Sequence, residues 1–445
     1  MPDTIRHVAC TVCGCVCDDL AVTVDAGRVV RAEGACRLAE PWYLAQNTHR
    51  PPATLVDGAP AEPDAAFARA AELLAASRAP LIYGLSRSTT EGQRAATALA
   101  DRLGATIDTT ASTGHAPSIM ALQQVGESTS TLGEVKNRAD LVVFWGSDPV
   151  VTHPRHLERY SADPVGRFVP GGRRDRFVVV VDERETETAK LADRFIQVEP
   201  GCHWEALWRL RMLVRLGPEG HRDTGTQGHR DTGTGTPSQS LSPSVPQSLS
   251  LEDLASRMKT CRCGIVFFGS GITREPLGHR VVEALLQLVT DLNEHTRFYA
   301  RRMRRFGDVA GADSVLAWQT GYPFGVNLAR GYPRYNPGEF TGPELLARGE
   351  VDLCLVVGGE TIADLPPAAR AHLDRIPVIL LDAPDAETDL KAAVRFTTAV
   401  YGVHRPGTAY RMDEVPIPLR VILPTDYPSD GEVLNELLRR VGGLP

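Results

Sequence analysis

Short apolar runs alternate with longer amphipathic stretches along most of the chain from Pro80 onward. The apolar runs have the length of strands and end in Gly or Asp, so they predict strands that are buried on both faces and therefore parallel. They span residues 80–86, 140–148, 176–186, 264–273, 351–361 and 377–384. Helical periodicity lies between them, most clearly at 64–78, 90–104, 204–216 and 276–289. This βαβα succession predicts an α/β fold with mostly parallel sheets.

The pattern changes at three places, which predict the domain boundaries. Residues 1–52 contain two strand-like runs around the turn Asp25-Ala26-Gly27 and predict a small N-terminal module. Residues 217–250 repeat HRDTGT and contain no aromatic residue, so they predict a disordered insertion. This insertion separates a first α/β domain at 53–216 from a second at 251–395, and residues 396–445 are expected to wrap over the second domain.

Composition and charge limit the classes of partner. The chain has 445 residues, of which 42% are apolar, and this suits a globular protein with two or more cores. Its 48 Lys and Arg against 55 Asp and Glu give a net charge of −7, which disfavours nucleic acid as a general partner. No apolar run reaches the roughly 18–20 residues that a membrane span needs. The N-terminus lacks the apolar segment of a signal peptide, so we expect a cytoplasmic protein.

Five of the nine cysteines fall before residue 37, and four of these have the spacing of metal ligands. Cys10, Cys13, Cys17 and Cys36 form the motif C-x2-C-x3-C-x18-C. A compact loop with three thiolates and a distant fourth suits a [4Fe–4S] cluster, whose four iron corners each take one sulfur ligand. Zinc is more often held by paired C-x2-C knuckles. A zinc site and a module without metal are the alternatives.

Glycine and polar residues gather where the predicted strands end. In an open parallel sheet, ligands bind outside the carboxyl ends of the strands, where glycine lets backbone N–H groups approach a phosphate and side chains add directional bonds. The candidate cofactor-binding residues are Gly84, Ser86, Gly146, Ser147, Asp148, Asp182, Arg184, Thr186, Gly269, Gly271, Gly358 and Glu360. A turn is the alternative role for each glycine taken alone. Nicotinamide and Walker-type sites are disfavoured, because neither glycine-rich motif is found.

The order of these motifs resembles the molybdopterin oxidoreductase superfamily. More narrowly, long strings resemble the B subunit of formylmethanofuran dehydrogenase over nearly the whole chain apart from 217–250. The strings are HAPSIMALQQVG (115–126), TLGEVKNRADLVVFWGSDP (131–149), HPRHLERY (153–160), VDERETETA (181–189), WQTGYPFGVNLARGYPRYNPGE (318–339) and GTAYRMDEVP (407–416). Strings of this length are far more specific than any single motif.

This resemblance implies an iron–sulfur module followed by two parallel-sheet α/β halves of the molybdopterin oxidoreductase type. It implies a tungstopterin or molybdopterin and a [4Fe–4S] cluster. The implied activity in one-carbon metabolism interconverts CO2 or formate and a formyl group on a methanofuran-like carrier. The implied partners are other subunits of a complex, among them an amidohydrolase-like subunit and one whose β-barrel closes over the pterin, since this chain ends soon after the second half.

His115 and Arg304 match the acid–base and anion-positioning residues of this family, so the resemblance assigns them catalytic roles. An imidazole can move a proton, and a guanidinium can hold a carboxylate. A hydrogen-bonded loop histidine is the alternative for His115. Arg304 is one of five arginines at 297–305, which suit pterin pyrophosphate, an acidic carrier tail, a neighbouring subunit or a solvated face. His153 and His156 are interpreted as capping or packing residues.

The chain departs from the family at residue 114. The family places a metal-ligating Cys or selenocysteine immediately before the histidine that matches His115, and this chain has Gly114 there. A tungsten or molybdenum centre would lose its protein ligand, and a hydroxyl of Ser112 or Thr113 would be out of register. The chain's own redox activity is therefore open. A redox-silent structural subunit of a formyltransferase/hydrolase complex is the alternative function, and a zinc-stabilised binding module is a third.

Overall fold

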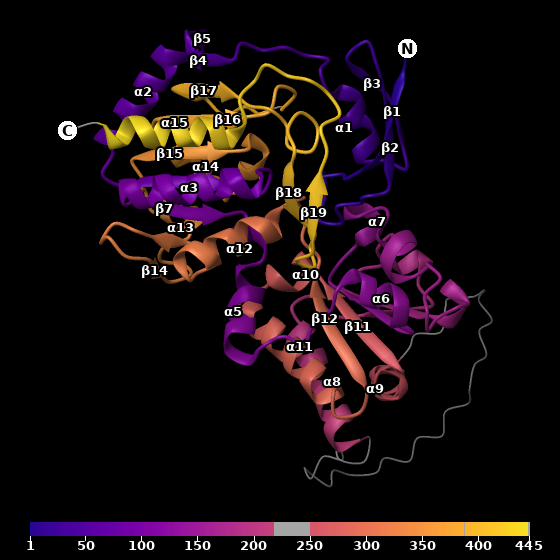
Figure 1. Cartoon of the computed structure of the whole chain (residues 1–445). Coiled ribbons are helices and arrows are strands. Elements are labelled where there is room, and N and C mark those ends of the chain that lie inside the picture. The colour runs from indigo at the N-terminus through magenta and orange to yellow at the C-terminus, as the bar shows by residue number, and fades with distance from the viewer. Residues whose placement is uncertain (218–249, 387, 444–445) are drawn as a thin grey trace, which may run out of the picture. The chain divides into compact units, whose positions relative to one another are not determined.

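The structure is a computed structural model and describes residues 1–217, 250–386 and 388–443. Its helices and strands, labelled in Figure 1, divide between two compact units. The larger unit comprises Met1–Met120, Pro149–Leu157 and Arg302–Pro445, and the smaller unit comprises Ala121–Asp148 and Glu158–Arg301. The insertion predicted at 217–250 lies, apart from its two end residues, outside the described residues. Within the described ranges, no helix is both long and apolar enough to cross a membrane.

The larger unit is built on a mixed sheet whose central strands are parallel, as the apolar runs predict. The strands, in order across the sheet, are β14 (Arg334–Tyr335), β13 (Val326–Asn327), β7 (Thr106–Thr109), β6 (Pro80–Gly84), β15 (Leu353–Val357), β16 (Val378–Asp382), β17 (Val394–Thr397), β4 (Thr54–Val56) and β5 (Ala59–Pro60). The carboxyl ends of the five parallel strands from β7 to β17 therefore share one edge of the sheet.

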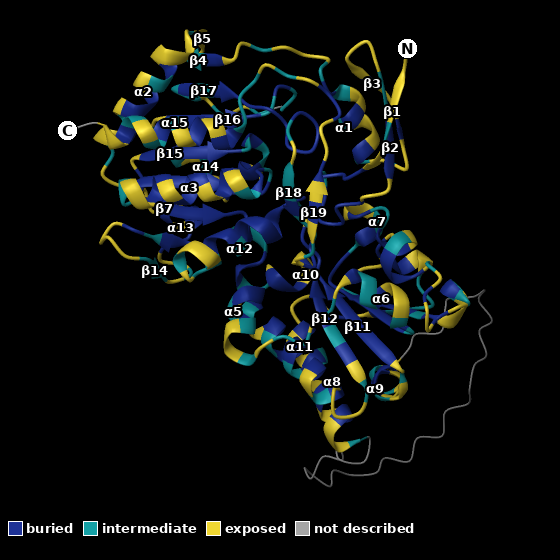
Figure 2. Cartoon of the chain, in the orientation of Figure 1, coloured by how far each residue is buried: buried dark blue, intermediate teal, exposed yellow. Residues whose placement is uncertain are grey.

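Helices cover both faces of this sheet, which explains why its strands are apolar without alternation. Ile82 and Leu355 pack on one face, and Leu81 and Val356 pack on the other. Figure 2 shows these strands as buried. The helices of the first face are α2 (Pro63–Ala76), α3 (Thr90–Leu103), α12 (Val309–Thr320) and α15 (Asp430–Gly442), and those of the second face are α13 (Gly342–Ala347) and α14 (Pro367–Leu373).

The smaller unit repeats this plan around a second sheet. Its strands are β10 (Arg194–Gln197), β9 (Phe177–Asp182), β8 (Leu141–Trp145), β11 (Cys263–Phe268) and β12 (Arg297–Arg302). The first four are parallel to their neighbours. One face packs through Val143, Val181 and Phe268 against three helices. These are α8 (His203–Leu216), α9 (Leu251–Thr260) and α11 (Gly278–Leu292). The mixed α/β architecture with parallel sheets is thus confirmed in both units.

The predicted N-terminal hairpin is present. β1 (Asp3–Val8), β2 (Leu20–Asp25) and β3 (Arg28–Glu33) form an antiparallel sheet, and α1 (Ala39–Ala45) follows them. The C-terminal segment pairs β18 (Gly407–Tyr410) with β19 (Pro416–Leu419), and Ala409 and Leu419 pack with Ala9 and Val16. The segment therefore covers the N-terminal module as well as part of the α/β core.

The division of the chain differs from the serial domains predicted at 53–216 and 251–395. Both predicted domains are split between the two units, because β6 and β7 share a sheet with β15 to β17. For example, Pro80 of the first predicted domain pairs with Leu353 of the second predicted domain in this sheet. The apolar pattern of a strand predicts its burial but carries no information about a partner hundreds of residues away.

Candidate functional site

The loop between β1 and β2 gathers the cysteines that the sequence predicts as ligands. Cys10, Cys13 and Cys17 come from this loop, and Cys36 lies between β3 and α1. The backbone N–H of Cys10 donates to the carbonyl of Cys17 at 2.8 Å, which closes the loop. The four cysteines line one small cavity together with Cys15. All of them are free thiols, so the cavity offers five reduced sulfur atoms.

Burial disfavours thiolates in this cavity unless a cation compensates their charge. Burial, and then the charge of Cys13, raises the pKa of the Cys10 thiol well above its usual range. A bound metal reverses this effect because it binds the thiolate form. A single zinc ion, with Zn–S bonds of about 2.3 Å, would hold its sulfur ligands about 4 Å apart. Among the described residues, no three cysteine sulfurs all lie within 4.8 Å of one another. The sulfurs are therefore farther apart than a single zinc ion would hold them, and this spacing suits a cluster better.

The cysteine loop packs directly against the segment that carries Arg304. A Cβ on Gly14 would overlap the carbonyl oxygen of Arg304, and a Cβ on Gly307 would overlap that of Thr11. Nε2 of His153 lies 2.7 Å from the Arg304 carbonyl oxygen, and burial lowers the pKa of His153 to about 4. His153 is therefore a neutral packing residue, as the sequence predicts.

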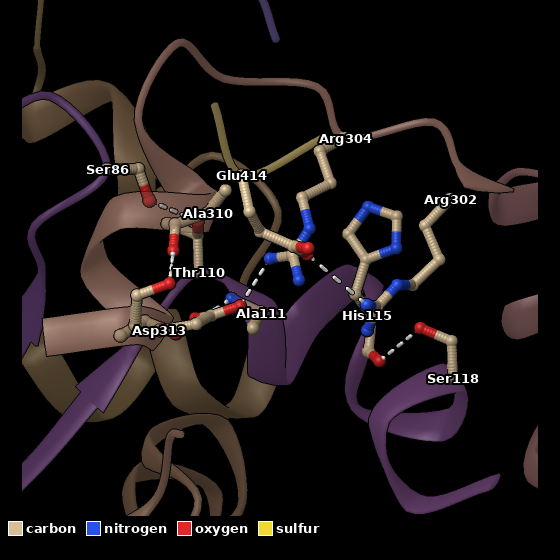
Figure 3. Close-up of polar contacts among 12 residues, drawn as sticks. Ser86, Thr110, Ala111, His115, Ser118, Arg302, Arg304, Ala310, Asp313 and Glu414 are labelled. Carbon is tan, nitrogen blue, oxygen red and sulfur yellow. Dashed lines mark hydrogen bonds and ion pairs between the residues drawn. The ribbon is translucent and has the colours of Figure 1, made fainter. Parts of the chain in front are cut away.

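His115 lies immediately after α4 (Ala111–Gly114) and is held through its backbone. Its N–H donates to the carbonyl of Ala111 at 2.6 Å, and its carbonyl accepts from the Ser118 hydroxyl at 2.8 Å. In the view of Figure 3, the imidazole ring is drawn between the side chains of Arg302 and Arg304. The structure thus assembles the two predicted catalytic residues in one region of the larger unit.

Arg304 is buried, and its charge is compensated inside the chain. Its Nη1 forms an ion pair with Asp313, and the Thr109 hydroxyl donates to the other Asp313 oxygen at 2.8 Å. Burial raises the pKa of Asp313, although the charge of Arg304 opposes this effect. The ion pair fixes the orientation of the Arg304 guanidinium, and the negative charge of Asp313 offsets the positive charge of Arg304.

Gly114 offers no side-chain ligand, and its neighbours in the turn do not replace one. A Cβ at Gly114 would meet no described atom within 4 Å, so the position is open. The hydroxyls on both sides are used inside the turn, since Ser112 donates to the Thr109 carbonyl at 3.0 Å and Thr113 donates to the Thr110 carbonyl at 2.9 Å. Gly114 therefore provides no donor for tungsten or molybdenum, and a metal bound by deprotonated Ser112 or Thr113 would break the hydrogen bond that this hydroxyl donates.

The five arginines at 297–305 do not form a free basic patch, because each has a partner within its own unit. The partners are Glu134 for Arg297, the Ser130 carbonyl for Arg301, Glu414 for Arg302, Asp313 for Arg304 and Asp364 for Arg305. Arg301, Arg302 and Arg304 are buried, so a solvated face would be limited to Arg297 and Arg305, which are exposed.

A cavity of about 210 Å³ opens at the carboxyl ends of β15 and β16, the edge at which the sequence predicts ligand binding. Gly358 and Glu360, two of the predicted cofactor-binding residues, line it. Gly84 has a different role, since its φ is +113° and a Cβ there would overlap the carbonyl of Val357. The hydroxyl of Ser86 hydrogen-bonds to that of Thr110.

Buried oxygen acceptors converge on this cavity. Oδ2 of Asp382, Asp385 and Asp430 and Oε1 of Gln46 accept no hydrogen bond from any described residue. Burial is the main reason that the pKa values of Asp382 and Asp430 are raised to about 6. A ligand with several N–H donors would satisfy these oxygens. The sequence did not identify any of these four residues as a candidate for ligand binding. The one signal available in the sequence was that Asp382 ends an apolar strand, as Asp182 does.

The predicted glycines of the smaller unit pack against one another where β8 and β11 end. The N–H of Gly271 donates to the Gly146 carbonyl at 2.9 Å. A Cβ on Gly269 would lie 2.8 Å from the Ser147 Cβ, and one on Gly271 would lie 2.7 Å from the Gly146 Cα. The close approach of these two chain segments therefore explains by itself why glycine is needed at these positions.

The predicted polar residues of the smaller unit lie at the same edge of its sheet. Asp148 accepts from the backbone N–H and hydroxyl of Thr188 at 3.1 and 2.6 Å, and the Thr186 hydroxyl accepts from the Ala189 N–H. Burial raises the pKa of Asp182, while Arg184 is exposed. Asp148 and Thr186 thus stabilise their own loop, and Arg184 is the one whose side chain projects into solvent.

Glu183, His203 and Glu275 are the described group whose possible ligand atoms lie within 4.8 Å of one another. The indole N–H of Trp145 donates to Nδ1 of His203 at 2.9 Å. A neutral imidazole that accepts at Nδ1 carries its proton on Nε2, and this nitrogen then cannot bind a metal. Nε2 lies 3.6 Å from Glu275 and 3.8 Å from Glu183. We therefore interpret the group as a buried polar contact.

No family model matches the chain, but individual proteins do. It is 38% identical over 450 residues to the B subunit of the tungsten-containing formylmethanofuran dehydrogenase 2 of Methanocaldococcus jannaschii, with 99% of each chain covered. It is 27% identical over 303 residues to the B subunit of the formyltransferase/hydrolase complex Fhc of Methylorubrum extorquens, with 68% of this chain and 74% of the relative covered.

The fold is also similar to a solved structure. The crystal structure of the formyltransferase/hydrolase complex FhcABCD from Methylorubrum extorquens, in complex with methylofuran, contains a chain that matches with a TM-score of 0.69 and 25% identity. The match covers 87% of the present chain and 98% of that chain.

Proposed function

Since the chain belongs to the B-subunit family of formylmethanofuran dehydrogenases, we propose that it is the B subunit of such a complex in one-carbon metabolism. The complex would interconvert CO2 or formate and a formyl group on a methanofuran-like carrier. The observation that carries this proposal is the 38% identity over 99% of both chains, because it includes the cysteine loop and the His115 region. The proposed partners are further subunits, among them an amidohydrolase-like subunit and a β-barrel subunit. The relative in the FhcABCD complex with methylofuran supports an assembly of this kind.

The cysteine cavity fits a [4Fe–4S] cluster held by Cys10, Cys13, Cys17 and Cys36. The four thiols converge on one buried cavity, and their spacing is wider than one zinc ion requires. When bound, such a cluster supplies one-electron transfer.

The cavity at β15 and β16 fits the organic part of a pterin cofactor. The amino and ring N–H groups of a pterin match the Oδ2 atoms of Asp382, Asp385 and Asp430, which accept no hydrogen bond from a described residue. The metal does not fit at Gly114, where neither a side chain nor an unused neighbouring hydroxyl is available. We derive no step through tungsten or molybdenum.

The chain's own groups for formyl or carboxylate chemistry are His115 and Arg304. The imidazole of His115 can hold or move a proton at a ring nitrogen. The guanidinium of Arg304, oriented by Asp313, can bind a carboxylate oxygen. These two residues would bind and orient the substrate and manage its proton, while the electron chemistry needs a further centre.

A redox-silent structural subunit of a formyltransferase/hydrolase complex is the second candidate. Gly114 and the TM-score of 0.69 to a chain of such a complex favour it. The higher identity to the dehydrogenase relative, 38% against 27%, and the complete set of four thiols favour the first candidate.

Anaerobic purification of the chain with its partners, followed by assays on a formylated furan carrier, tests the proposal. We expect formyl turnover that depends on this chain. Reduction of an artificial electron acceptor in step with this turnover would support the dehydrogenase, with its electron chemistry at a further centre. Formate release without acceptor reduction would support the second candidate. An assembly that leaves the formylated carrier unchanged would contradict both.

A further inference from the structure

Arg155 reaches the cysteine cavity from a distant part of the chain. Of the described residues that line this cavity, all except Pro154 and Arg155 belong to residues 10–39. Among these described lining residues, Arg155 is the one with a charged side chain. A cation therefore lies beside the thiols at the place where negative charge collects when they bind a metal.

Three hydrogen bonds fix the guanidinium of Arg155. Nη1 and Nη2 donate to the two oxygens of Asp19 at 2.8 Å each, and Nη1 also donates to the Gly34 carbonyl oxygen at 2.7 Å. This two-pronged pairing sets the plane of the guanidinium. The Arg155 side chain is 13% exposed and that of Asp19 is 43% exposed, so water screens the carboxylate more than the cation. The cavity is therefore lined by a fixed cation whose counter-ion is more exposed to solvent than the cation itself.

The turn that carries Arg155 is anchored independently of the Arg155 side chain. His153 bonds to the Arg304 carbonyl at 2.7 Å. Arg37, which follows Cys36, donates to the carbonyls of Val150 and Val151 at 2.9 Å each. A substitution at Arg155 leaves these anchors in place, so its effect on charge can be separated from an effect on the fold.

A fixed cation acts on the redox equilibrium of a cluster in a known direction. A [4Fe–4S] cluster with four thiolate ligands is anionic, and its net charge is one of the factors that set its reduction potential. Reduction adds one electron from a one-electron donor, and no proton moves and no bond forms or breaks. A nearby positive charge stabilises the more negative, reduced form.

We propose that Arg155 is a positioning residue for the cluster, and that its fixed charge beside the cysteine cavity raises the reduction potential. Asp19 holds Arg155 in place and partly offsets its charge. This inference rests on the proposed [4Fe–4S] cluster and deepens it.

The test measures a potential and a metal content in the anaerobically purified complex. The cluster is titrated with dithionite and followed by electron paramagnetic resonance, and iron per chain is determined in parallel. Arg155→Gln retains its iron, but the ratio of reduced to oxidised cluster at the wild-type midpoint falls about tenfold, which corresponds to about 59 mV. Asp19→Asn shifts the midpoint upward. Arg31→Gln changes an exposed arginine of the same module and leaves the midpoint unchanged.

An iron-loaded Arg155→Gln cluster with the wild-type midpoint overturns the inference. If Arg155→Gln loses its iron, Asp19→Asn decides, because an upward shift supports the inference and an unchanged midpoint overturns it. Arg155→Lys retains the charge and is expected near the wild-type midpoint. A wild-type complex without iron overturns the proposed cluster together with the inference, whereas an iron-loaded complex that is indifferent to Arg155 overturns the inference alone.

Discussion

The cysteine loop and the turn at α4 both belong to the larger unit, yet they keep different parts of a redox centre. The loop and the nearby Cys36 keep the four predicted ligand thiols around one cavity. The turn keeps His115 and a firmly bonded backbone, but Gly114 provides no donor atom from a side chain. The backbone conformation of the turn and the metal ligand it carries are therefore separable, since the hydrogen bonds around α4 do not depend on the side chain at residue 114.

Removing one ligand of the cysteine loop should have the strongest consequence, which is loss of the cluster. Cys13→Ala removes one of four thiolates, and we expect iron to fall from about four per chain to below about one, because each corner of the cluster needs a ligand. Colorimetric iron analysis of the anaerobic complex measures this. Cys202→Ala, which changes an exposed cysteine, is the control and keeps its iron. Equal iron in the two variants would contradict the assignment.

The contact between the loop and the Arg304 segment gives the second effect. Gly14→Ala places a methyl group against the Arg304 carbonyl, so we expect the free energy of unfolding to fall by about 1–3 kcal/mol. Urea denaturation of the complex measures the change. Gly133→Ala is the matched control, because a Cβ there would come no closer than 3.6 Å to a neighbour. A Gly14→Ala variant as stable as this control would show that the close packing is not required.

The acceptor cavity predicts a third, pH-dependent effect. Burial raises the pKa of Asp382 to about 6 from 3.8, so the folded state binds the proton more tightly than the unfolded state does. The protonated carboxyl of Asp382 therefore contributes fully to the stability of the folded state below about pH 4, and this contribution is lost as the pH rises through about 6. Asp382→Asn has no such loss, so its stability relative to wild type should rise across this window by on the order of 2 kcal/mol.

Denaturation of both proteins at several pH values between 4 and 7 measures this difference. Asp389→Asn, which changes a largely exposed aspartate, is the control for the loss of one surface carboxylate. A constant difference between Asp382→Asn and wild type would contradict the prediction.

The smallest effect on stability is expected at Gly114. Because a Cβ there meets no described atom within 4 Å, Gly114→Cys should change the free energy of unfolding by less than about 0.5 kcal/mol. The new thiol should nevertheless increase the tungsten or molybdenum retained by the complex. Gly114→Ala adds the methylene-sized group without sulfur and should retain no more metal than wild type. Equal tungsten and molybdenum contents in wild type, Gly114→Cys and Gly114→Ala would show that residue 114 does not limit metal binding.

Sequence reasoning found the features that depend on local pattern. The strand over Leu141–Trp145 and the loop of Cys10, Cys13 and Cys17 follow from burial and spacing over a few residues. It could not find features that depend on distant contacts. The glycines Gly146 and Gly271 look like phosphate-binding glycines in the sequence, but their mutual contact accounts for them equally well. The acceptor cavity combines Gln46, Asp382 and Asp430, and no local pattern connects positions so far apart.

The most direct test of the account is the metal content of the anaerobically purified wild-type complex. Inductively coupled plasma mass spectrometry would give iron, tungsten and molybdenum per copy of this chain, after correction for metal bound by the partner subunits. We expect about four iron atoms at the cysteine loop and no stoichiometric tungsten or molybdenum. One tungsten or molybdenum atom per chain, seated beside His115, would contradict it.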